Sequence, residues 1–261
     1  MTSTLVSVDN LKIAFRKNSV DTIAVRKLTF SIKEGETLAI VGESGSGKSV
    51  TTKLILGLLN QKNVRKKGQI IFNNKNILNL SQKEFKKIRG NDISIIFQDP
   101  IAALNPVFKI KDQFYEVNLN NKPLSKKESF LIASKALEKV SIRDPERVLE
   151  SYPFQLSGGL AQRVIITMAM INKPELLLAD EPIASLDPLN ARLAMEALHS
   201  INKDDGITVI CNLHTLDTAR HYCDRIIGMK SGEIVFDGTP RKLTDNTARV
   251  VMTFIRSPLV T

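Results

Sequence analysis

The chain has 261 residues, of which 43% are hydrophobic and 25% are charged, with a formal net charge of +10. This length and composition allow a substantial buried core, as one large domain or as one domain with a subdomain. No apolar run approaches the roughly 18 residues of a membrane span, and Met1 to Asn10 lacks the pattern of a secretory signal. We therefore expect a globular protein that is kept in the cytoplasm. With only Cys211 and Cys223, a disulfide scaffold and a four-cysteine zinc site are also excluded.

The positive charge is concentrated in two runs, Lys62 to Lys67 and Lys122 to Lys127. Such runs occur on surfaces that face nucleic acid or anionic membranes. Neither run contains aromatic residues, and the chain has no Trp and only three Tyr, so a platform for stacking bases is not indicated. We expect a solvated basic face and no nucleic-acid partner, although a position beside anionic lipid is compatible with this charge.

The first hundred residues alternate between strand and helix signals. The expected strands are Leu5 to Phe15, Ala24 to Ile32 after a polar break at Arg16 to Asp21, Thr37 to Val41, Gly68 to Phe72 and Ile93 to Phe97. Helical periodicity covers Val50 to Leu59, and Ser81 to Glu84 has the form of a capping box that opens a short helix.

A glycine-rich loop joins the strand ending at Val41 to the helix that follows. Its residues are Gly42, Glu43, Ser44, Gly45, Ser46, Gly47, Lys48 and Ser49, and Val50 comes next. The segment fits G-x-x-x-x-G-K-[ST], in which backbone N–H groups cradle phosphates, the lysine reaches the β- and γ-phosphates, and the hydroxyl ligates Mg²⁺. Strand, loop and helix occur in the required order, which predicts a nucleotide-phosphate site with Lys48 and Ser49 in those roles.

From Ile101 to about Tyr152 the strand signals stop and helical ones dominate, with a second capping box at Ser125 to Glu128. This pattern predicts a helical insertion in an α/β domain. Alternation then returns: strands at Leu176 to Asp180, Thr208 to Cys211, Arg225 to Met229 and Glu233 to Phe236, and helices at Pro188 to Ile201, Leu216 to Tyr222 and Asn246 to Arg256. Such alternation favours a mainly parallel sheet with its ligand at the carboxyl ends of the strands.

Two acids, Asp180 and Glu181, end an apolar strand downstream of the P-loop. In this arrangement the first carboxylate can support Mg²⁺ and the second can orient or deprotonate an attacking water. We assign these roles to Asp180 and Glu181 respectively.

The segment Leu156 to Arg163, with Ser157, Gly158 and Gly159 at its start, resembles the signature motif of ABC-transporter ATPases. It lies between the P-loop and the acidic strand end, as that family requires, and it opens a helix. A serine and two glycines at a helix N-terminus can form a second phosphate-binding patch.

The other elements of this family have counterparts. Gln98 resembles the Q-loop glutamine that contacts Mg²⁺ and the attacking water, Asp187 belongs to a D-loop-like segment, and His214 resembles the switch histidine that contacts the γ-phosphate. Phe15 is the candidate for the aromatic that stacks on adenine, with ordinary strand packing as the alternative.

The resemblance implies an α/β P-loop NTPase core, a mainly parallel sheet, an N-terminal antiparallel β subdomain and an inserted helical subdomain. The expected α/β core comprises residues 1–100 and 173–261, and the helical subdomain comprises residues 101–172 with the signature helix. In this family two subunits pair head to tail and bury two MgATP, so a homodimer or a homologous heterodimer is implied. Lys48, Gln98, Glu181 and His214 would then be the catalytic set, and Ser49, Gln98 and Asp180 would hold the metal.

The implied activity is ATP hydrolysis that energises import through separate integral membrane permease subunits, with an extracytoplasmic solute-binding protein as an indirect partner. The subunit would lie peripherally on the cytoplasmic face of the cell membrane. Val41 to Leu59, Phe97 to Pro106 and Arg147 to Leu156 are similar to oligopeptide, dipeptide and nickel importer ATPases. Three C-terminal stretches are instead similar to phosphonate importer ATPases: Leu186 to Ala191, Asn212 to Arg220 and Phe236 to Pro240.

We favour the peptide or nickel type, because the Q-loop and the helical insertion should set the choice of permease. A phosphonate importer ATPase and a non-transport ABC ATPase that acts on nucleic acid are the alternatives. Two departures are Ile183, where Thr is usual, and the end of the chain at Thr261, where peptide-type ATPases usually continue with a Pro- and Cys-containing tail.

Overall fold

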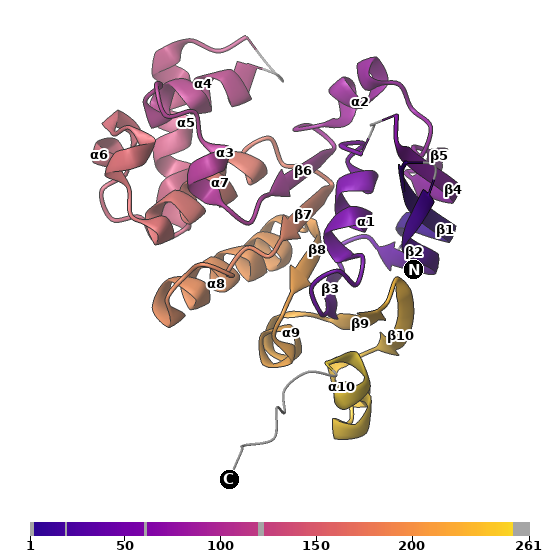
Figure 1. Ribbon diagram of the computed structural model, residues 1–261. Helices are drawn as coiled ribbons and strands as arrows, with labels where there is room; N and C mark the ends of the chain where they lie inside the picture. Colours follow the sequence, from indigo (N-terminus) through magenta and orange to yellow (C-terminus); the bar gives the residue numbers. More distant parts are fainter. Residues whose placement is uncertain (1–2, 19, 60–61, 120–122, 253–261) are drawn as a thin grey trace. The chain divides into compact units, whose positions relative to one another are not determined.

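The computed structural model describes residues 3–18, 20–59, 62–119 and 123–252 (Figure 1). These residues form two compact units. Unit 1 comprises residues 1–80 and 212–261, and unit 2 comprises residues 81–211. The predicted helical subdomain, residues 101–172, lies within unit 2.

Unit 1 contains seven strands in the order β5-β4-β1-β2-β10-β9-β3. They are β1 (Thr4–Lys17), β2 (Val20–Lys33), β3 (Thr37–Gly42), β4 (Val64–Phe72), β5 (Lys75–Asn76), β9 (Arg225–Lys230) and β10 (Glu233–Gly238). The pairs β1–β2, β1–β4, β4–β5 and β9–β10 are antiparallel, whereas β3–β9 and β2–β10 are parallel. The helices are α1 (Lys48–Ile55), α9 (Leu216–Tyr222) and α10 (Asp245–Val251). The expected antiparallel N-terminal layer and parallel P-loop strand are both present.

Unit 2 combines a small parallel sheet with most of the helices. Strands β6 (Ile93–Ile96) and β7 (Leu176–Asp180) pair in parallel, and β8 (Thr208–Leu213) begins here and ends in unit 1. The helices are α2 (Gln82–Ile88), α3 (Pro100–Ala103), α4 (Ile110–Leu119), α5 (Lys126–Lys139), α6 (Pro145–Glu150), α7 (Gly158–Met170) and α8 (Pro188–Asp205). The helical insertion predicted after Ile101 is confirmed.

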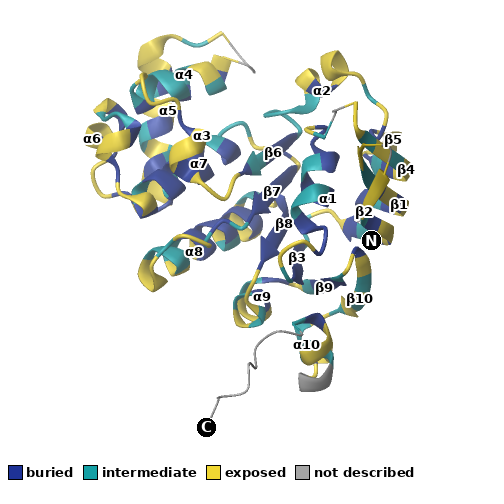
Figure 2. Ribbon diagram, viewed as in Figure 1, coloured by how far each residue is buried: buried dark blue, intermediate teal, exposed yellow. Residues whose placement is uncertain are grey.

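The central strands are buried along their whole length, which explains their continuous apolar sequences. All six residues of β3 and all five residues of β7 are buried (Figure 2). A strand covered on both faces needs no polar alternation, and this is typical of parallel sheets. Because β3 and β7 lead directly into the P-loop and the acidic pair, both candidate segments start from rigid supports.

Both predicted capping boxes are confirmed. The Oγ atoms of Ser81 and Ser125 accept hydrogen bonds from the backbone N–H groups of Glu84 and Glu128. In return, the carboxylate of each glutamate accepts a hydrogen bond from the backbone N–H of the serine. These reciprocal bonds satisfy two otherwise unpaired donors at each helix start.

Several predicted boundaries were wrong. The polar stretch Arg16 to Asp21 does not end the strands, because β1 and β2 continue into it and Arg16 pairs with Asp21 across the hairpin at 4.0 Å. Helix α1 covers residues 48–55 rather than 50–59. The C-terminal helix is described to Val251, and the predicted continuation past residue 252 lies outside the described residues.

Candidate functional site

The P-loop of unit 1 wraps around the ammonium group of its own lysine. The Nζ atom of Lys48 donates hydrogen bonds to the carbonyl oxygens of Gly42 at 2.6 Å and Glu43 at 3.0 Å, and the residue is only 4% exposed. Ser44 and Gly45 form the exposed tip of the loop, and Ser49 and Val50 lie half-buried in the first turn of α1. A buried cation in a ring of backbone groups suits an anionic ligand.

The N-terminus of α1 has no side-chain cap. Its N-cap residue is Gly47, and the first turn contains no acidic side chain. By contrast, side chains cap the first turns of seven other described helices: Ser81 for α2, Asp99 for α3, Ser125 for α5, Asp144 for α6, Ser157 for α7, Asp187 for α8 and Thr244 for α10. Uncapped N–H groups and the helix dipole together make a site for phosphate.

Two loop glycines are required by close backbone contacts. A Cβ atom at Gly47 would lie 2.9 Å from the carbonyl oxygen of Ala24, and Gly47 has a left-handed φ of 106°. A Cβ atom at Gly42 would collide with the carbonyl oxygen of Met229. The loop can therefore follow this path only with glycine at both positions.

The loop also contains polar atoms that its own residues do not satisfy. The Oγ of Ser46 and the Oε1 of Glu43 are buried without a hydrogen-bond partner. Buried polar atoms in native proteins are nearly always paired, so an unpaired hydroxyl in a phosphate-type loop fits a bound phosphate group. The residues present thus fit ATP.

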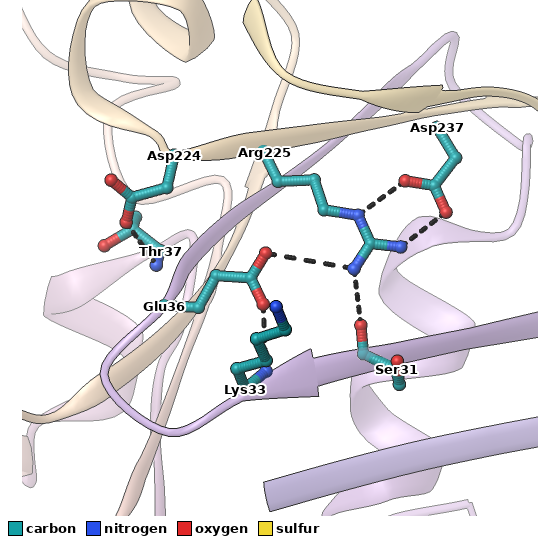
Figure 3. A network of polar contacts seen from close by, with 7 residues as sticks. All are labelled: Ser31, Lys33, Glu36, Thr37, Asp224, Arg225 and Asp237. Carbon is teal, nitrogen blue, oxygen red and sulfur yellow. Dashed lines mark hydrogen bonds and ion pairs between the residues drawn. The ribbon is translucent and has the colours of Figure 1, made fainter. Parts of the chain in front are cut away.

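A network of charged side chains anchors the strand that carries the loop (Figure 3). Arg225 donates two hydrogen bonds of 2.5 Å to Asp237 and one of 2.7 Å to the carbonyl of Ser31. Asp224 accepts a bond of 2.9 Å from the N–H of Thr37, the first residue of β3. The pKa of the Arg225 guanidinium is raised, and the hydrogen bond to the carboxylate of Asp237 is the largest cause of this shift. The network joins β2, β3, β9 and β10 and so fixes the strand that leads into the P-loop.

Two further residues of unit 1 were predicted to contact nucleotide. His214 lies exposed just after β8, and Phe15 lies half-buried on β1, paired with Thr22 and Val64 of the neighbouring strands. Asn212 was not predicted, but it is fully buried and its Nδ2 donates to the Oγ1 of Thr52 on α1 at 3.2 Å. In the sequence, the signal that could have identified Asn212 was its position two residues before His214.

In unit 2, the acidic pair lies at the end of the buried strand β7. Asp180 is 4% exposed, while Glu181 is half-buried with a left-handed φ of 56°. A non-glycine residue in this conformation is strained, and such strain is common at functional sites. Gln98 is exposed and is the second residue after the end of β6. Magnesium typically takes one or two carboxylates with phosphate and water oxygens, so the carboxylate of Asp180 and the amide oxygen of Gln98 are donors of a type that suits this ion, as is the hydroxyl of Ser49 in unit 1.

The signature-like segment and the D-loop-like segment contact each other within unit 2. Gly159 is buried, and a Cβ atom there would collide with the terminal amide of Asn190. The Nδ2 of Asn190 donates to the Oδ2 of Asp187 at 2.6 Å, while Asp187 caps α8. This side-chain bond is the largest of the effects that lower the pKa of Asp187. Asn190 was missed in the sequence analysis, and its place in the first turn of α8 was the only signal.

The start of α7 keeps its hydroxyl donor available. The Oγ of Ser157 accepts a long bond of 3.4 Å from the N–H of Leu160, and Ser157 and Gly158 are both exposed. Since a hydroxyl can accept and donate at once, Ser157 can cap its own helix and still offer a proton to a phosphate oxygen.

None of the helices that the structure describes is long and apolar enough to cross a membrane. Within the same ranges, no group of three or more His, Cys, Asp and Glu side chains is placed to hold a metal ion.

Comparisons with known proteins agree on one family. The model of the ABC transporter family matches residues 25–184. The dipeptide transport ATP-binding protein DppD of Bacillus subtilis is 41% identical over 92% of this chain and 72% of its own length. The oligopeptide transport ATP-binding protein OppD of Escherichia coli is 38% identical over 91% of this chain and 70% of its own.

A solved structure supports the same assignment. The dimeric ATP-binding cassette MJ0796, in a post-hydrolysis state bound to ADP and Pi, is 30% identical, with a TM-score of 0.81 over 90% of this chain and 99% of that chain. The expected ABC ATPase fold is therefore confirmed. From the P-loop geometry, the family match and these relatives, we conclude that the chain belongs to the ABC transporter family, as one of its ATP-binding, ATP-hydrolysing proteins.

Proposed function

We propose that this protein is the ATPase subunit of an importer for peptides. The observation that carries the proposal is the identity of 37–41% to several curated dipeptide and oligopeptide transport ATP-binding proteins, over more than nine-tenths of the chain. Those matches extend through the C-terminal third, where the resemblance to phosphonate importers stays a prediction.

In this proposal the P-loop binds the phosphates of ATP. Lys48 places its charge against the β- and γ-phosphates, while the uncapped N–H groups of α1 and the hydroxyl of Ser46 donate to phosphate oxygens. Phe15 would stack on adenine. When bound, Mg²⁺ supplies charge neutralisation at the phosphates, and Ser49, Asp180 and Gln98 are the residues that would hold it.

The hydrolytic step needs a positioned water. Glu181 would accept its proton or orient it for in-line attack, and the strained backbone at this residue supports a functional role. Gln98 would contact the same water, and His214 would donate to the γ-phosphate. Lys48 and the loop amides would stabilise the charge that develops in the transition state.

A complete site would require a second subunit. The proton of Ser157 and the exposed start of α7 suit a phosphate held by the P-loop of another copy or a homologous chain. Asp187 would approach the same interface. MgATP would then close the dimer and hydrolysis would open it, and separate permease subunits at the cytoplasmic face of the membrane would use this motion for solute uptake.

The first test is ATP turnover by the full chain. Lys48→Ala should abolish Mg²⁺-dependent hydrolysis, and Glu181→Gln should retain ATP and accumulate as a dimer in size-exclusion chromatography. Lys53→Ala, at the other end of α1, is the matched control and should hydrolyse normally. Full activity in Lys48→Ala would refute the assigned site.

The second test concerns the transported solute. The chain should restore growth on peptides to cells that lack the ATPase of a peptide permease, and the integral membrane protein that co-purifies with it should be such a permease. The phosphonate-like stretches make a phosphonate importer the second candidate. Complementation of a phosphonate permease but not of a peptide or nickel permease would overturn the first proposal.

A further inference from the structure

The antiparallel layer of unit 1 carries a hollow of about 620 Å³ that the proposed function does not use. Residues from β1, β2, β4 and β10 line it. Five of the lining residues are cations: Lys12, Arg26, Lys27, Arg65 and Lys67. Only two are acids, Asp21 and Glu233.

Both acids have basic neighbours. Asp21 lies 3.6 Å from Arg65 and 4.0 Å from Arg16, and Glu233 lies opposite Lys27 in the register of β10 with β2. The hollow therefore keeps a clear excess of positive charge on three strands whose hydrogen bonds fix their spacing.

Two of the cations face each other at a cost. Lys12 and Lys67 are direct partners in the register of β1 with β4, and like charges in such positions destabilise a sheet. Within the described ranges, neither lysine has a carboxylate at ion-pair distance. A shared anion between the two ammonium groups would turn this repulsion into attraction.

Lys12 and Ala14, two of the residues that line the hollow, lie on the opposite face of β1 from the predicted adenine-stacking residue. Along β1 and β4, Lys12 and Ala14 pair with Lys67 and Arg65, while Phe15 pairs with Val64. Side chains alternate between the faces of a sheet, so Phe15 points away from the face that carries Ala14 and Arg65. These side chains therefore point away from a nucleotide that stacks on Phe15.

We propose that this hollow is a second anion site, which takes a ligand carrying two or more linked phosphate groups. Its volume is within the range of small-molecule sites. Lysine and arginine are the usual phosphate partners. The half-exposed Ala14 and Ile23, which is 53% exposed, supply an apolar floor beside the cations for the carbon part of an organic phosphate.

The test measures binding of sodium tripolyphosphate by calorimetry to the full chain, with the P-loop saturated by MgADP. Lys67→Glu places a carboxylate opposite Lys12 and should weaken binding at least about tenfold, equivalent to about 1.4 kcal/mol. Because it removes a like-charge pair, the same variant should melt at the same temperature as the wild type or higher. Lys86→Glu on α2, a residue that does not line the hollow, makes the same change in net charge and should bind normally.

The outcomes separate the site from general attraction to positive charge. No binding to the MgADP-loaded wild type, or equal weakening by Lys67→Glu and Lys86→Glu, would overturn the proposal. Flotation with phosphatidylcholine vesicles, with and without cardiolipin, whose headgroup carries two phosphates, distinguishes the source of the phosphate. Vesicle binding that Lys67→Glu removes would assign a lipid headgroup, and tripolyphosphate binding without vesicle binding would assign a soluble ligand.

Discussion

Replacing Gly159 with alanine tests the contact between the signature-like segment and the D-loop-like segment. The new Cβ atom would collide with the terminal amide of Asn190. Asn190 would have to rotate away and give up its 2.6 Å bond to Asp187. Gly158→Ala is a matched control, because the nearest atom to a Cβ atom there is in Leu186 at 4.0 Å.

The expected stability change follows from two opposing effects. Alanine in place of glycine favours a helix by about 0.5–1 kcal/mol, and less in the first turn, at both positions. Inserting a methyl group into a packed site costs about 1–3 kcal/mol. The cost is at the low end of this range where the atoms in the way are at the end of a side chain that can rotate. Gly158→Ala should therefore be neutral or slightly stabilising, and Gly159→Ala should be less stable than Gly158→Ala by about 1–2 kcal/mol.

The assay that isolates the mechanism is an NMR titration of Asp187. Its bond from Asn190 holds the pKa of Asp187 below the usual value, so Asn190→Ala should raise that pKa. Gly159→Ala should also raise the pKa of Asp187. The double variant should show no further rise, because both substitutions remove the same bond between Asn190 and Asp187. An unchanged Asp187 pKa in Gly159→Ala would show that Asn190 is not displaced and would refute the reasoning. On the proposed function, ATP turnover should fall in Gly159→Ala and persist in Gly158→Ala.

Three further outcomes are expected. Arg225→Gln removes a partly buried bidentate pair with Asp237, so the free energy of unfolding should fall by about 2–3 kcal/mol and Tm by roughly 4–10 °C. The control Arg192→Gln removes an exposed ion pair and should change Tm little. Equal Tm values for the two variants would contradict the role of the network. Burial, reinforced by Asp224, raises the pKa of the Cys223 thiol to about 12, so iodoacetamide at pH 8 should modify Cys223 only after unfolding. Since the thiol of the unfolded chain ionises first, the contribution of Cys223 to the free energy of unfolding should decline above about pH 9. Rapid labelling of the folded protein would argue against burial. Ser125→Ala should lower the free energy of unfolding by about 1 kcal/mol through loss of the α5 cap, and Ser125→Asp should restore it in urea titrations.

The elements with strong local signals could be predicted from the sequence. Ser81 and Ser125 marked true helix starts, and the apolar runs before Gly42 and Glu181 marked strands, because capping and burial are encoded within a few residues. The hairpin at Arg16 to Asp21 could not be predicted in this way. Its polar residues gave no strand pattern, and their strand conformation depends on pairing across the hairpin, with β4 alongside.

The candidate site divides in a similar way. Residues within contiguous motifs, such as Lys48 and Ser157, could be proposed from the sequence because their chemistry depends on neighbours in the chain. Asn190 and Asn212 were missed, because their roles depend on contacts with Gly159 and Thr52, which lie far away in the sequence. Their positions beside predicted site residues mark the neighbourhood, but a lone asparagine in a helix or strand does not indicate which distant residue it contacts.

The two predicted phosphate-binding helix starts differ in a way that bears on the order of assembly. A side-chain cap and a bound phosphate use the same N–H groups, and α1 has no side-chain cap whereas α7 is capped by Ser157. Helix α1 therefore gains most from nucleotide, while α7 already has one of its first N–H groups bonded to Ser157 and contributes chiefly the proton of that serine. Ser157→Asp keeps the acceptor for the Leu160 N–H but has no proton to donate, so the monomer should bind ATP with unchanged affinity and the ATP-dependent dimer should be lost. Weaker binding of ATP by monomeric Ser157→Asp would mean that α7 takes part before pairing, contrary to this order.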